Sequence, residues 1–391
     1  MIALENLHIS FVQSLEEITA SEWDMCNTTH NPFTSYAFLH ALEQSNSVGD
    51  STGWSPYHMI IRSSETVDAT IAACMPMYLK GHSYGEYVFD HGWADAYERA
   101  GGQYYPKLQS CAPFTPATGQ RLLINNNCAP EHHEALKSAL LGGLQQITQK
   151  LGLSSAHLTF VPEDEAITAE QNGFLIRHDQ QFHWYNRDYE SFESFLAQLS
   201  SRKRKQIKKE RRTVHETDIQ IETITGQEIN EAHWDAFYEF YIDTGARKWG
   251  QPYLTRSFFS AIGKAMPDKI VLFLCKRADR YIAGALNFLG PDTIYGRQWG
   301  CIEDHPYLHF ETCYYRAIEY AIKHKLRHVE AGAQGAHKLA RGYEPVRTFS
   351  AHYIQNDSFQ TAVAHFLEQE REGIAGEINY LSTKTPFKKD T

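Results

Sequence analysis

The sequence predicts an α/β protein built from two copies of one structural unit, and three observations lead to this prediction. First, a chain of 391 residues is too long for one ordinary domain and fits two domains of roughly 150–200 residues. Second, Glu17-Ile18 and Trp23-Asp24 recur as Glu228-Ile229 and Trp234-Asp235, both shifted by 211 positions. Third, the order of strand and helix patterns is the same in both halves. We expect one domain over residues 1–190 and a second over 191–391.

The elements of the two halves are expected in matching order. Each half begins with a short alternating strand, at 8–12 or 219–223, and continues with a helix that carries the Trp-Asp pair. A second helix follows Pro32 or Pro252. Three antiparallel strands come next, because apolar runs alternate with tight turns. They are expected at 57–62, 69–79 and 84–90 in the first half, and at 270–275, 281–289 and 293–299 in the second.

A long amphipathic helix is predicted after each set of three strands. In the second half its apolar face is formed by Cys313, Tyr314, Ala317, Ile318, Ala321 and Ile322. A strand follows the helix, at 157–161 or 328–331. Each half then closes with Gly173-Phe174 or Gly342-Tyr343 before a final strand.

The composition is that of a globular protein, with 42% apolar and 21% charged residues. The first ten residues lack the features of a signal peptide, and no apolar run approaches the roughly 18 residues needed to span a membrane. The seven cysteines are scattered and form no CxxC pair, which is typical of reduced thiols in the cytosol. We therefore expect a cytoplasmic protein with no transmembrane segment and no metal site; peripheral contact with a membrane stays open.

A strongly basic segment lies between the two halves. Residues 202–212 hold eight basic residues and one acidic residue, a net charge of +7, whereas the whole chain carries −10. Ser200 or Ser201 is a suitable N-cap for a helix over 201–213. The basic residues Arg202, Lys203, Arg204 and Lys205 could bind the phosphates of tRNA, coenzyme A, a nucleotide-linked precursor or an anionic lipid. A merely solvated helix face is the alternative.

The succession of three strands, long helix, strand, Gly-aromatic pair and last strand resembles the GNAT acyltransferase unit, and two such units in tandem resemble the FemAB-like transferases. Three stretches are similar to the FemAB-like N-acyltransferases of peptidoglycan biosynthesis and recognition: residues 87–97, 200–205 and 330–343. The resemblance implies tandem GNAT-like units, each a central mixed sheet flanked by helices. It also implies transfer of an acyl or aminoacyl group to a small-molecule or peptide amine, with aminoacyl-tRNA as the donor.

In the GNAT-like unit the fourth and fifth strands part at one end, and backbone groups there can bind an acyl carbonyl. We expect the reactive centre in the second half, because polar residues are dense after its fifth strand. Glu330 could accept a proton from the attacking amine, or simply pair with a nearby cation. Gln334 is a candidate for the acyl carbonyl, Lys338 for a phosphate or carbonyl oxygen, and His337 for moving a proton. Surface solvation is the alternative for Gln334 and Lys338.

Substrate contacts are expected at the same strand ends. In the second half the candidates are Trp299, Gly300, Glu303, His309, Arg341 and Tyr343. In the first half they are Asp90, Trp93, Asp95 and Tyr97, where aromatic and acidic residues would suit a sugar or peptide acceptor; a packed loop is the alternative. The residues from Cys301 to Glu311 include metal-binding types, but their spacing matches no site pattern, so no metal is predicted.

The acyl donor separates three hypotheses. GNAT enzymes that use acetyl-CoA carry Arg/Gln-x-x-Gly-x-Gly/Ala before the long helix, where backbone amides bind the pyrophosphate. The nearest stretches, 297–302 and 247–252, both fail at the last position. We therefore favour a FemAB-like N-acyltransferase without a tightly bound cofactor. The alternatives are a GNAT enzyme that uses acyl-CoA or an acyl carrier protein, and a non-catalytic module that binds a cell-wall precursor or RNA.

Overall fold

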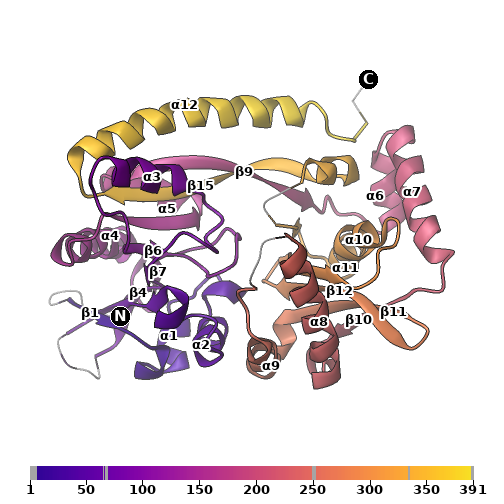
Figure 1. Ribbon diagram of the computed structural model, residues 1–391, viewed down its shortest axis with the longest axis horizontal. Coiled ribbons are helices and arrows are strands. Elements are labelled where there is room, and N and C mark those ends of the chain that lie inside the picture. Colours follow the sequence, from indigo (N-terminus) through magenta and orange to yellow (C-terminus); the bar gives the residue numbers. More distant parts are fainter. Residues whose placement is uncertain (1–6, 65, 67–68, 249–251, 333–334, 389–391) are drawn as a thin grey trace. The chain divides into compact units, whose positions relative to one another are not determined.

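The computed structural model describes residues 7–64, 66, 69–248, 252–332 and 335–388 (Figure 1). These residues form two compact units. Unit 1 comprises the described residues up to Asp179 together with Arg347–Ala375, and unit 2 comprises Gln180–Val346 together with the described residues from Gly376 onward. Each unit is built on a mixed sheet with flanking helices, so the predicted α/β fold class is confirmed.

Unit 1 contains two sheets. The first has the order β1-β3-β4-β7, and the strands of the second in this unit follow the order β15-β8-β6-β5-β2. In the second sheet β6 and β8 run parallel, whereas β8 and β15 run antiparallel. The strands are β1 (His8–Val12), β2 (Trp54–Pro56), β3 (His58–Arg62), β4 (Ile71–Met75), β5 (Tyr78–Lys80), β6 (Lys107–Ser110), β7 (Leu123–Ile124) and β8 (Ser155–Val161).

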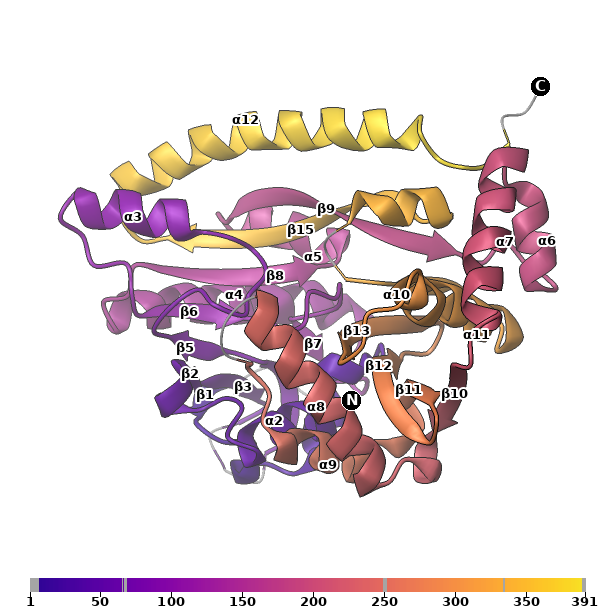
Figure 2. The same cartoon turned by 45° about the vertical axis from the view of Figure 1, so that its right-hand side comes forward.

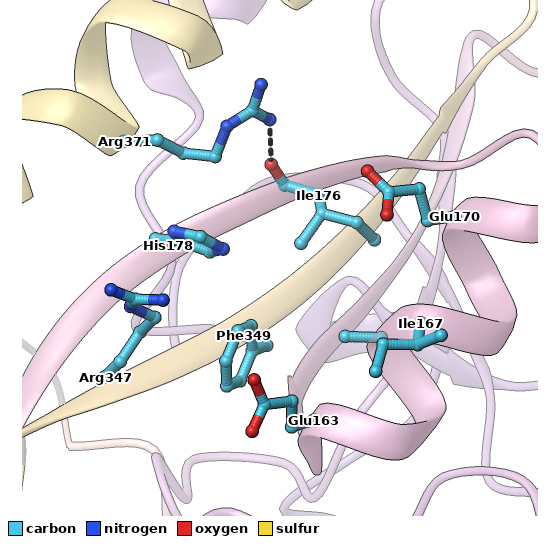
Figure 3. A pocket seen from close by; sticks show the side chains of 9 residues that line it. Glu163, Ile167, Glu170, Ile176, His178, Arg347, Phe349 and Arg371 are labelled. Carbon is cyan, nitrogen blue, oxygen red and sulfur yellow. Dashed lines mark hydrogen bonds between the residues drawn. The ribbon is translucent and has the colours of Figure 1, made fainter. Parts of the chain in front are cut away.

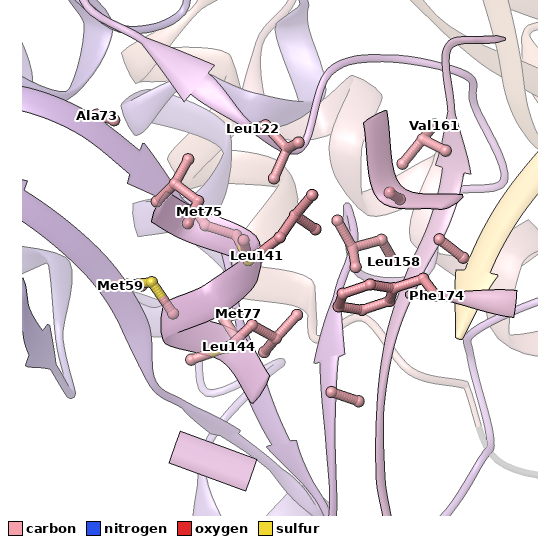
Figure 4. Close-up of a cluster of buried hydrophobic side chains, with 14 of the residues drawn as sticks. Met59, Ala73, Met75, Met77, Leu122, Leu141, Leu144, Leu158, Val161 and Phe174 are labelled. Carbon is pink, nitrogen blue, oxygen red and sulfur yellow. The ribbon is translucent and has the colours of Figure 1, made fainter. Parts of the chain in front are cut away.

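The helices of unit 1 cover its second sheet from two sides. Leu141 and Leu144 of α4 pack with Met59, Leu158 and Phe174 in the main apolar core of this unit (Figure 4). Trp93 of α3 packs instead against Val363 and Leu367 of α12. The helices are α1 (Ala20–Asp24), α2 (Tyr36–Gln44), α3 (His91–Arg99), α4 (His133–Lys150), α5 (Glu163–Gln171) and, as far as Ala375, α12 (Asp357–Ser382). The short 3-10 turns are at Leu15–Glu17, Pro32–Thr34, Asp50–Thr52 and Pro130–His132.

The strands of unit 2 follow the order β10-β11-β12-β13-β14-β9. Figure 2 shows β10 to β13 side by side. The first four strands are antiparallel, and β13 then pairs parallel with β14. Successive side chains of β11 point to opposite faces of the sheet, so that Val271 and Phe273 enter one core. The strands are β10 (Gln220–Thr225), β11 (Ile270–Arg277), β12 (Arg280–Leu289), β13 (Thr293–Cys301) and β14 (His328–Glu330).

Helices also cover both faces of the unit 2 sheet. Ala317, Ile318 and Ala321 of α11 are buried on one face, as the predicted amphipathic helix requires. On the other face α8 lies so close to β13 that a Cβ on Gly300 would be 2.3 Å from the Phe240 carbonyl oxygen. The helices are α6 (Phe192–Gln198), α7 (Ser201–His215), α8 (Glu231–Lys248), α9 (Arg256–Ala265), α10 (Leu308–Phe310), a π-helical turn (Glu311–Tyr315) and α11 (Arg316–Lys323), with 3-10 turns at Gly226–Glu228, Pro267–Lys269 and Ala336–Arg341.

The two sequence repeats exchange their closing strands. β9 (Leu175–Tyr185), which ends the first repeat, pairs with β14 of unit 2 through His183, Trp184 and Tyr185. β15 (Glu344–Ile354), which ends the second repeat, pairs with β8 of unit 1. The compact units therefore differ from the repeats 1–190 and 191–391 in the strands that close them. A domain boundary between residues 190 and 191 remains a prediction.

One predicted strand is wrong, and another is interrupted. Residues 84–90 form a loop, because Gly85 and Tyr87 have φ values of +82° and +61°, which a strand does not accommodate. The strand that pairs parallel with β8 is instead β6. The strand expected at 69–79 divides into β4 and β5 at Pro76, which has no N–H to donate to a ladder.

Within the described part of the chain, no helix is long and apolar enough to cross a membrane.

Candidate active site

The fourth and fifth strands of unit 2, β13 and β14, are paired only over a short distance. Their parallel ladder joins Thr293 with His328, Ile294 with Val329 and Tyr295 with Glu330. Beyond that point β14 ends, whereas β13 continues along β12 to Cys301. A bulge at Arg297 shifts the β12–β13 register just after the ladder ends, and a bulge of this kind bends a strand and increases its twist. The strands thus part at the position where the sequence places the reactive centre.

Lys338 lies at the parted end of β14. It belongs to the 3-10 turn Ala336–Arg341, is only 2% exposed, and donates a hydrogen bond from Nζ to the Gly332 carbonyl oxygen at 2.7 Å. Burial lowers the pKa of the Lys338 ammonium to about 7; Cys313 opposes this effect and the charge of Arg297 adds to it. Near neutral pH a substantial fraction of this side chain is therefore a neutral amine, which can accept a proton.

Aromatic and histidine side chains surround the next part of the turn. Tyr314 Oη lies 2.8 Å from His337 Nε2, and the Tyr314 ring is 5.3 Å from that of His309 and 6.1 Å from that of Phe310. The rings of Trp299 and His309 are 5.3 Å apart. Tyr314 lies in the π-helical turn, a distortion that is frequent at functional sites. The structure thus brings together three predicted residues, Trp299, His309 and His337, around a tyrosine that was not predicted.

Burial perturbs the ionisation of this cluster. It raises the pKa of the Tyr314 hydroxyl well above its usual value. It also lowers the pKa of His337, and the positive charges of Arg341 and Lys338 lower it further. At neutral pH His337 is therefore a neutral imidazole in contact with a protonated phenol.

Arg341 is held by a buried ion pair. Its Nη2 lies 3.1 and 3.0 Å from the two carboxylate oxygens of Glu210, and Glu210 is also bound by the Tyr315 hydroxyl. The Arg341 guanidinium stacks on Phe310 at 3.5 Å, and both members of the ion pair are 4% exposed. These contacts attach the 3-10 turn to helix α7, so the position of Lys338 depends on Arg341.

Glu330 ends β14 beside a histidine that was not predicted. His183 Nε2 on β9 lies 3.9 Å from Glu330 Oε2. Burial lowers the pKa of His183 to about 3, so this imidazole is neutral at physiological pH. Because β9 comes from the end of the first repeat and lies 147 positions away in the sequence, no local pattern could have indicated this neighbour.

The other predicted residues of unit 2 have structural contacts. Gly300 allows the close approach of α8, Glu303 is ion-paired with Arg277 at 2.7 Å and is bound to His305 at 2.9 Å, and Tyr343 is fully buried beside Tyr314. Gln334 lies outside the described residues. A substrate-binding role for Gly300, Glu303 and Tyr343 stays a prediction, and so does a catalytic role for Gln334.

The predicted basic helix is present as α7, and Ser200 is its N-cap residue. Its inner face carries Ile207, Glu210 and Val214, all buried, and Arg211 is ion-paired with Glu311 and Glu319. The predicted phosphate-binding residues are Arg202 and Lys205, which are exposed, and Lys203 and Arg204, which are half-buried. These four make no ion pair with any residue that the structure describes. The cations are therefore available for a ligand.

In unit 1 the four predicted residues do not form one site. Asp90 is buried and binds Lys107 and the Tyr104 hydroxyl, the latter at 2.7 Å. Burial alone would raise the pKa of Asp90, but Lys107 and His157 lower it below its usual value. Trp93 is buried against α12, Asp95 is exposed on α3, and the Tyr97 ring packs at a tilt against that of Phe359, with 4.7 Å between the ring centroids. These contacts correspond to the packed alternative.

A family model described as FemAB-like, peptidoglycan biosynthesis/recognition, matches residues 14–389. No curated protein sequence matches the chain significantly. The structure is similar to that of FemX, with 13% identity, a TM-score of 0.54, and coverage of 91% of this chain and 100% of that one.

Two further structures are similar. One is L-PGS from Bacillus licheniformis, with 9% identity, a TM-score of 0.51, and coverage of 87% of this chain and 98% of that one. The other is a tandem GNAT protein from the clavulanic acid biosynthesis pathway, with 11% identity, a TM-score of 0.45, and coverage of 90% and 99%. At these identities FemX and L-PGS show a shared fold, and the third similarity is too weak to carry an argument.

The buried ion pair predicts a large effect on stability. Arg341→Met should lower the free energy of unfolding by about 3–5 kcal/mol, because it leaves the Glu210 carboxylate buried without its cation. The double variant Arg341→Met/Glu210→Leu should recover most of that loss. Urea unfolding followed by circular dichroism measures both. Arg212→Met, on the exposed side of α7, is the control and should change stability by less than about 0.5 kcal/mol. If the Arg341→Met variant were as stable as the wild type, Arg341 would have no structural role, and its guanidinium would be available to bind substrate.

Proposed function

The chain belongs to the FemAB-like family of peptidoglycan biosynthesis and recognition, and from that premise we propose that unit 2 is an N-acyltransferase centre which moves an acyl or aminoacyl group to an amine. The observation that carries this proposal is the buried Lys338 amine beside the parted strands β13 and β14. A low-pKa amine can accept the proton of an attacking amine, and backbone groups at strand ends can bind the acyl oxygen, so this arrangement suits amide formation from an activated ester.

The proposed reaction has one bond-forming and one bond-breaking event. The acceptor amine nitrogen attacks the acyl carbonyl carbon, a C–N bond forms, and the C–O bond to the ribose hydroxyl of the donor breaks. The amine loses a proton to the neutral Lys338 side chain, and the departing ribose oxygen gains one. The oxygen that becomes negative in between is bound at the strand ends, where preformed dipoles are worth more than in water.

Three further residues support this chemistry. Glu330, at the last paired position of β14, could orient the acceptor ammonium before it loses its proton. His337 and Tyr314 form a polar pair at 2.8 Å that could return a proton to the leaving oxygen. Both groups belong to unit 2 and to the segments that flank Lys338. For Gln334 the proposed contact with the acyl carbonyl rests on the sequence alone.

The structure favours aminoacyl-tRNA over acyl-CoA as the proposed donor. The nearest match to the pyrophosphate-binding sequence, 297–302, begins inside β13, where Gly300 is packed against α8. Its amides are therefore not arranged as a loop at a helix N-terminus, which is the geometry that holds a pyrophosphate. The second match, 247–252, lies partly outside the described residues. Helix α7 is the proposed contact for tRNA phosphates, because its Arg202, Lys203, Arg204 and Lys205 make no ion pair with any described residue.

The role of Lys338 predicts a distinctive pH profile. Because the neutral amine is the active form, the transfer rate should rise with pH through about 7, the pKa that burial gives this residue. Lys338→Met should lower the rate by about 10²–10⁴-fold, as expected for loss of a general base. Lys338→Arg should be equally inactive, because a guanidinium stays protonated. Transfer of a radiolabelled amino acid from charged tRNA to a lysine-containing peptide measures the rate.

The control is Lys325→Arg, an exposed lysine of the same unit, which should keep wild-type activity. Melting temperatures of all variants separate a catalytic defect from unfolding. A rate that falls above pH 7, or a fully active Lys338→Arg variant, would contradict a proton-accepting role.

The proposed contact of α7 with tRNA predicts a change in affinity without a change in stability. Replacing Arg202, Lys203, Arg204 and Lys205 together by Glu should weaken binding of charged tRNA by at least about tenfold. It should also make the dependence of affinity on salt shallower, since fewer counterions are released. Fluorescence anisotropy at several salt concentrations measures both.

Charge reversal elsewhere in unit 2 is the matched control. It uses four exposed lysines: Lys264, Lys323, Lys325 and Lys384. Equal loss of affinity in the two quadruple variants would mean that tRNA responds only to net charge and would exclude a specific contact at α7.

A further inference from the structure

A pocket of about 320 Å³ lies wholly within unit 1, on residues that the proposed reaction does not use (Figure 3). Its walls come from helix α5, from strands β9 and β15, and from helix α12. This volume is at the lower end for small-molecule sites and corresponds to the space of roughly ten water molecules. The pocket can therefore hold a ligand of the size of an amino acid or a dipeptide.

One wall of the pocket is cationic. Arg371 of α12 donates from Nη1 to the Ile176 carbonyl oxygen at 2.7 Å, which fixes its guanidinium above β9 (Figure 3). Arg347 on β15 is exposed and has no ion pair among the described residues. His178 lies between the two arginines in Figure 3. Burial and the charges of Arg347 and Arg371 lower the pKa of His178 to about 4, so it adds a hydrogen-bonding group without a charge.

The opposite wall is acidic. Glu163 and Glu170 are exposed on α5 and face the pocket. Neither makes an ion pair with any described residue, although two arginines line the same pocket. Opposite charges are thus held apart across the pocket rather than neutralising each other. Because two guanidiniums face two carboxylates, the lining has no net charge at neutral pH.

Apolar side chains lie between the charged walls. Phe349 and Ile176 line the pocket from β15 and β9, and Phe349 packs edge-on against the His178 ring at 5.2 Å. Ile167, on α5, also lines the pocket and is 52% exposed, so an uncovered apolar surface lies at the pocket.

We propose that this pocket binds a zwitterionic amino acid or dipeptide with an apolar side chain. The ligand carboxylate would lie against Arg347 and Arg371, the ammonium against Glu163 and Glu170, and the apolar side chain against Ile167 and Phe349. A simple anion such as phosphate would face the two carboxylates, and a simple cation would face the two guanidiniums. Only a ligand with both charges satisfies both walls. This proposal goes beyond the proposed function and does not depend on it, because all of these residues belong to unit 1.

The test is calorimetric titration of the full chain with defined probes. L-Leucine or L-leucyl-L-leucine should bind saturably. For whichever binds, the amide that lacks the carboxylate and the N-acetyl form that lacks the ammonium should each bind at least tenfold more weakly, a difference of 1.4 kcal/mol. Arg347→Gln, and separately the double variant Glu163→Gln/Glu170→Gln, should weaken the unmodified probe at least tenfold. Arg99→Gln, an exposed arginine of unit 1 outside the pocket, should leave affinity unchanged.

Three results would overturn the proposal. They are the absence of saturable binding of both leucine probes to the wild-type chain, equal affinity for the blocked and unblocked forms, and tighter binding of inorganic phosphate than of either probe. Because the comparison of blocked probes uses only the wild-type protein, it decides the question even if a variant is unstable. The substituted side chains are exposed, so melting temperatures should stay within a few degrees of the wild type.

Discussion

The short parallel ladder between β13 and β14 is the constraint on which the candidate centre depends. Three residue pairs join the strands, and the bulge at Arg297 follows directly after the last pair. A Cβ on Gly296 would lie 3.5 Å from the Glu330 carbonyl oxygen, so a residue without a side chain stands where the ladder ends. If the ladder were longer, the backbone groups proposed to bind the acyl oxygen would be used between the strands, and Lys338 would have no strand end to lie beside.

Charge pairs from distant segments hold this geometry in place. The 3-10 turn that carries Lys338 is attached to α7 by the Arg341–Glu210 pair, and α7 is attached to the π-helical turn by the Arg211–Glu311 pair. Buried pairs of this kind give little net stability but are costly to break. Here they fix the turn in a position where the low-pKa amine of Lys338 has no carboxylate within hydrogen-bonding distance among the described residues. Helix α7 thereby has two faces with different roles: the inner face positions the turn, and the outer face presents cations.

The sequence predicted those strands and helices whose bounds are set by nearby residues. The strands of unit 2 were predicted closely, because apolar runs such as 270–275 are bounded by turn residues. The loop at 84–90 was missed, since nothing in its composition shows that Gly85 and Tyr87 adopt left-handed conformations. The exchange of β9 and β15 could not be predicted, because the apolar pattern of each closing strand is compatible with pairing to β14 and with pairing to β8. Of the proposed centre, Glu330, His337 and Lys338 were identified from their density in one segment. His183, Glu210 and Tyr314 come from other elements, and only the fold reveals that they are neighbours.

The proposed reaction of unit 2 is transfer of an aminoacyl group from tRNA to an amine. A single-turnover experiment tests this reaction. The purified chain is combined with tRNAs that carry radiolabelled amino acids and with a lysine-containing stem peptide of peptidoglycan. Parallel reactions contain labelled acetyl-CoA instead. We expect label to move from tRNA into an alkali-stable amide of the peptide, and no label to move from acetyl-CoA. Transfer of label from acetyl-CoA but not from tRNA would contradict the proposed donor. If the label stayed on both donors, a transferase centre would be contradicted.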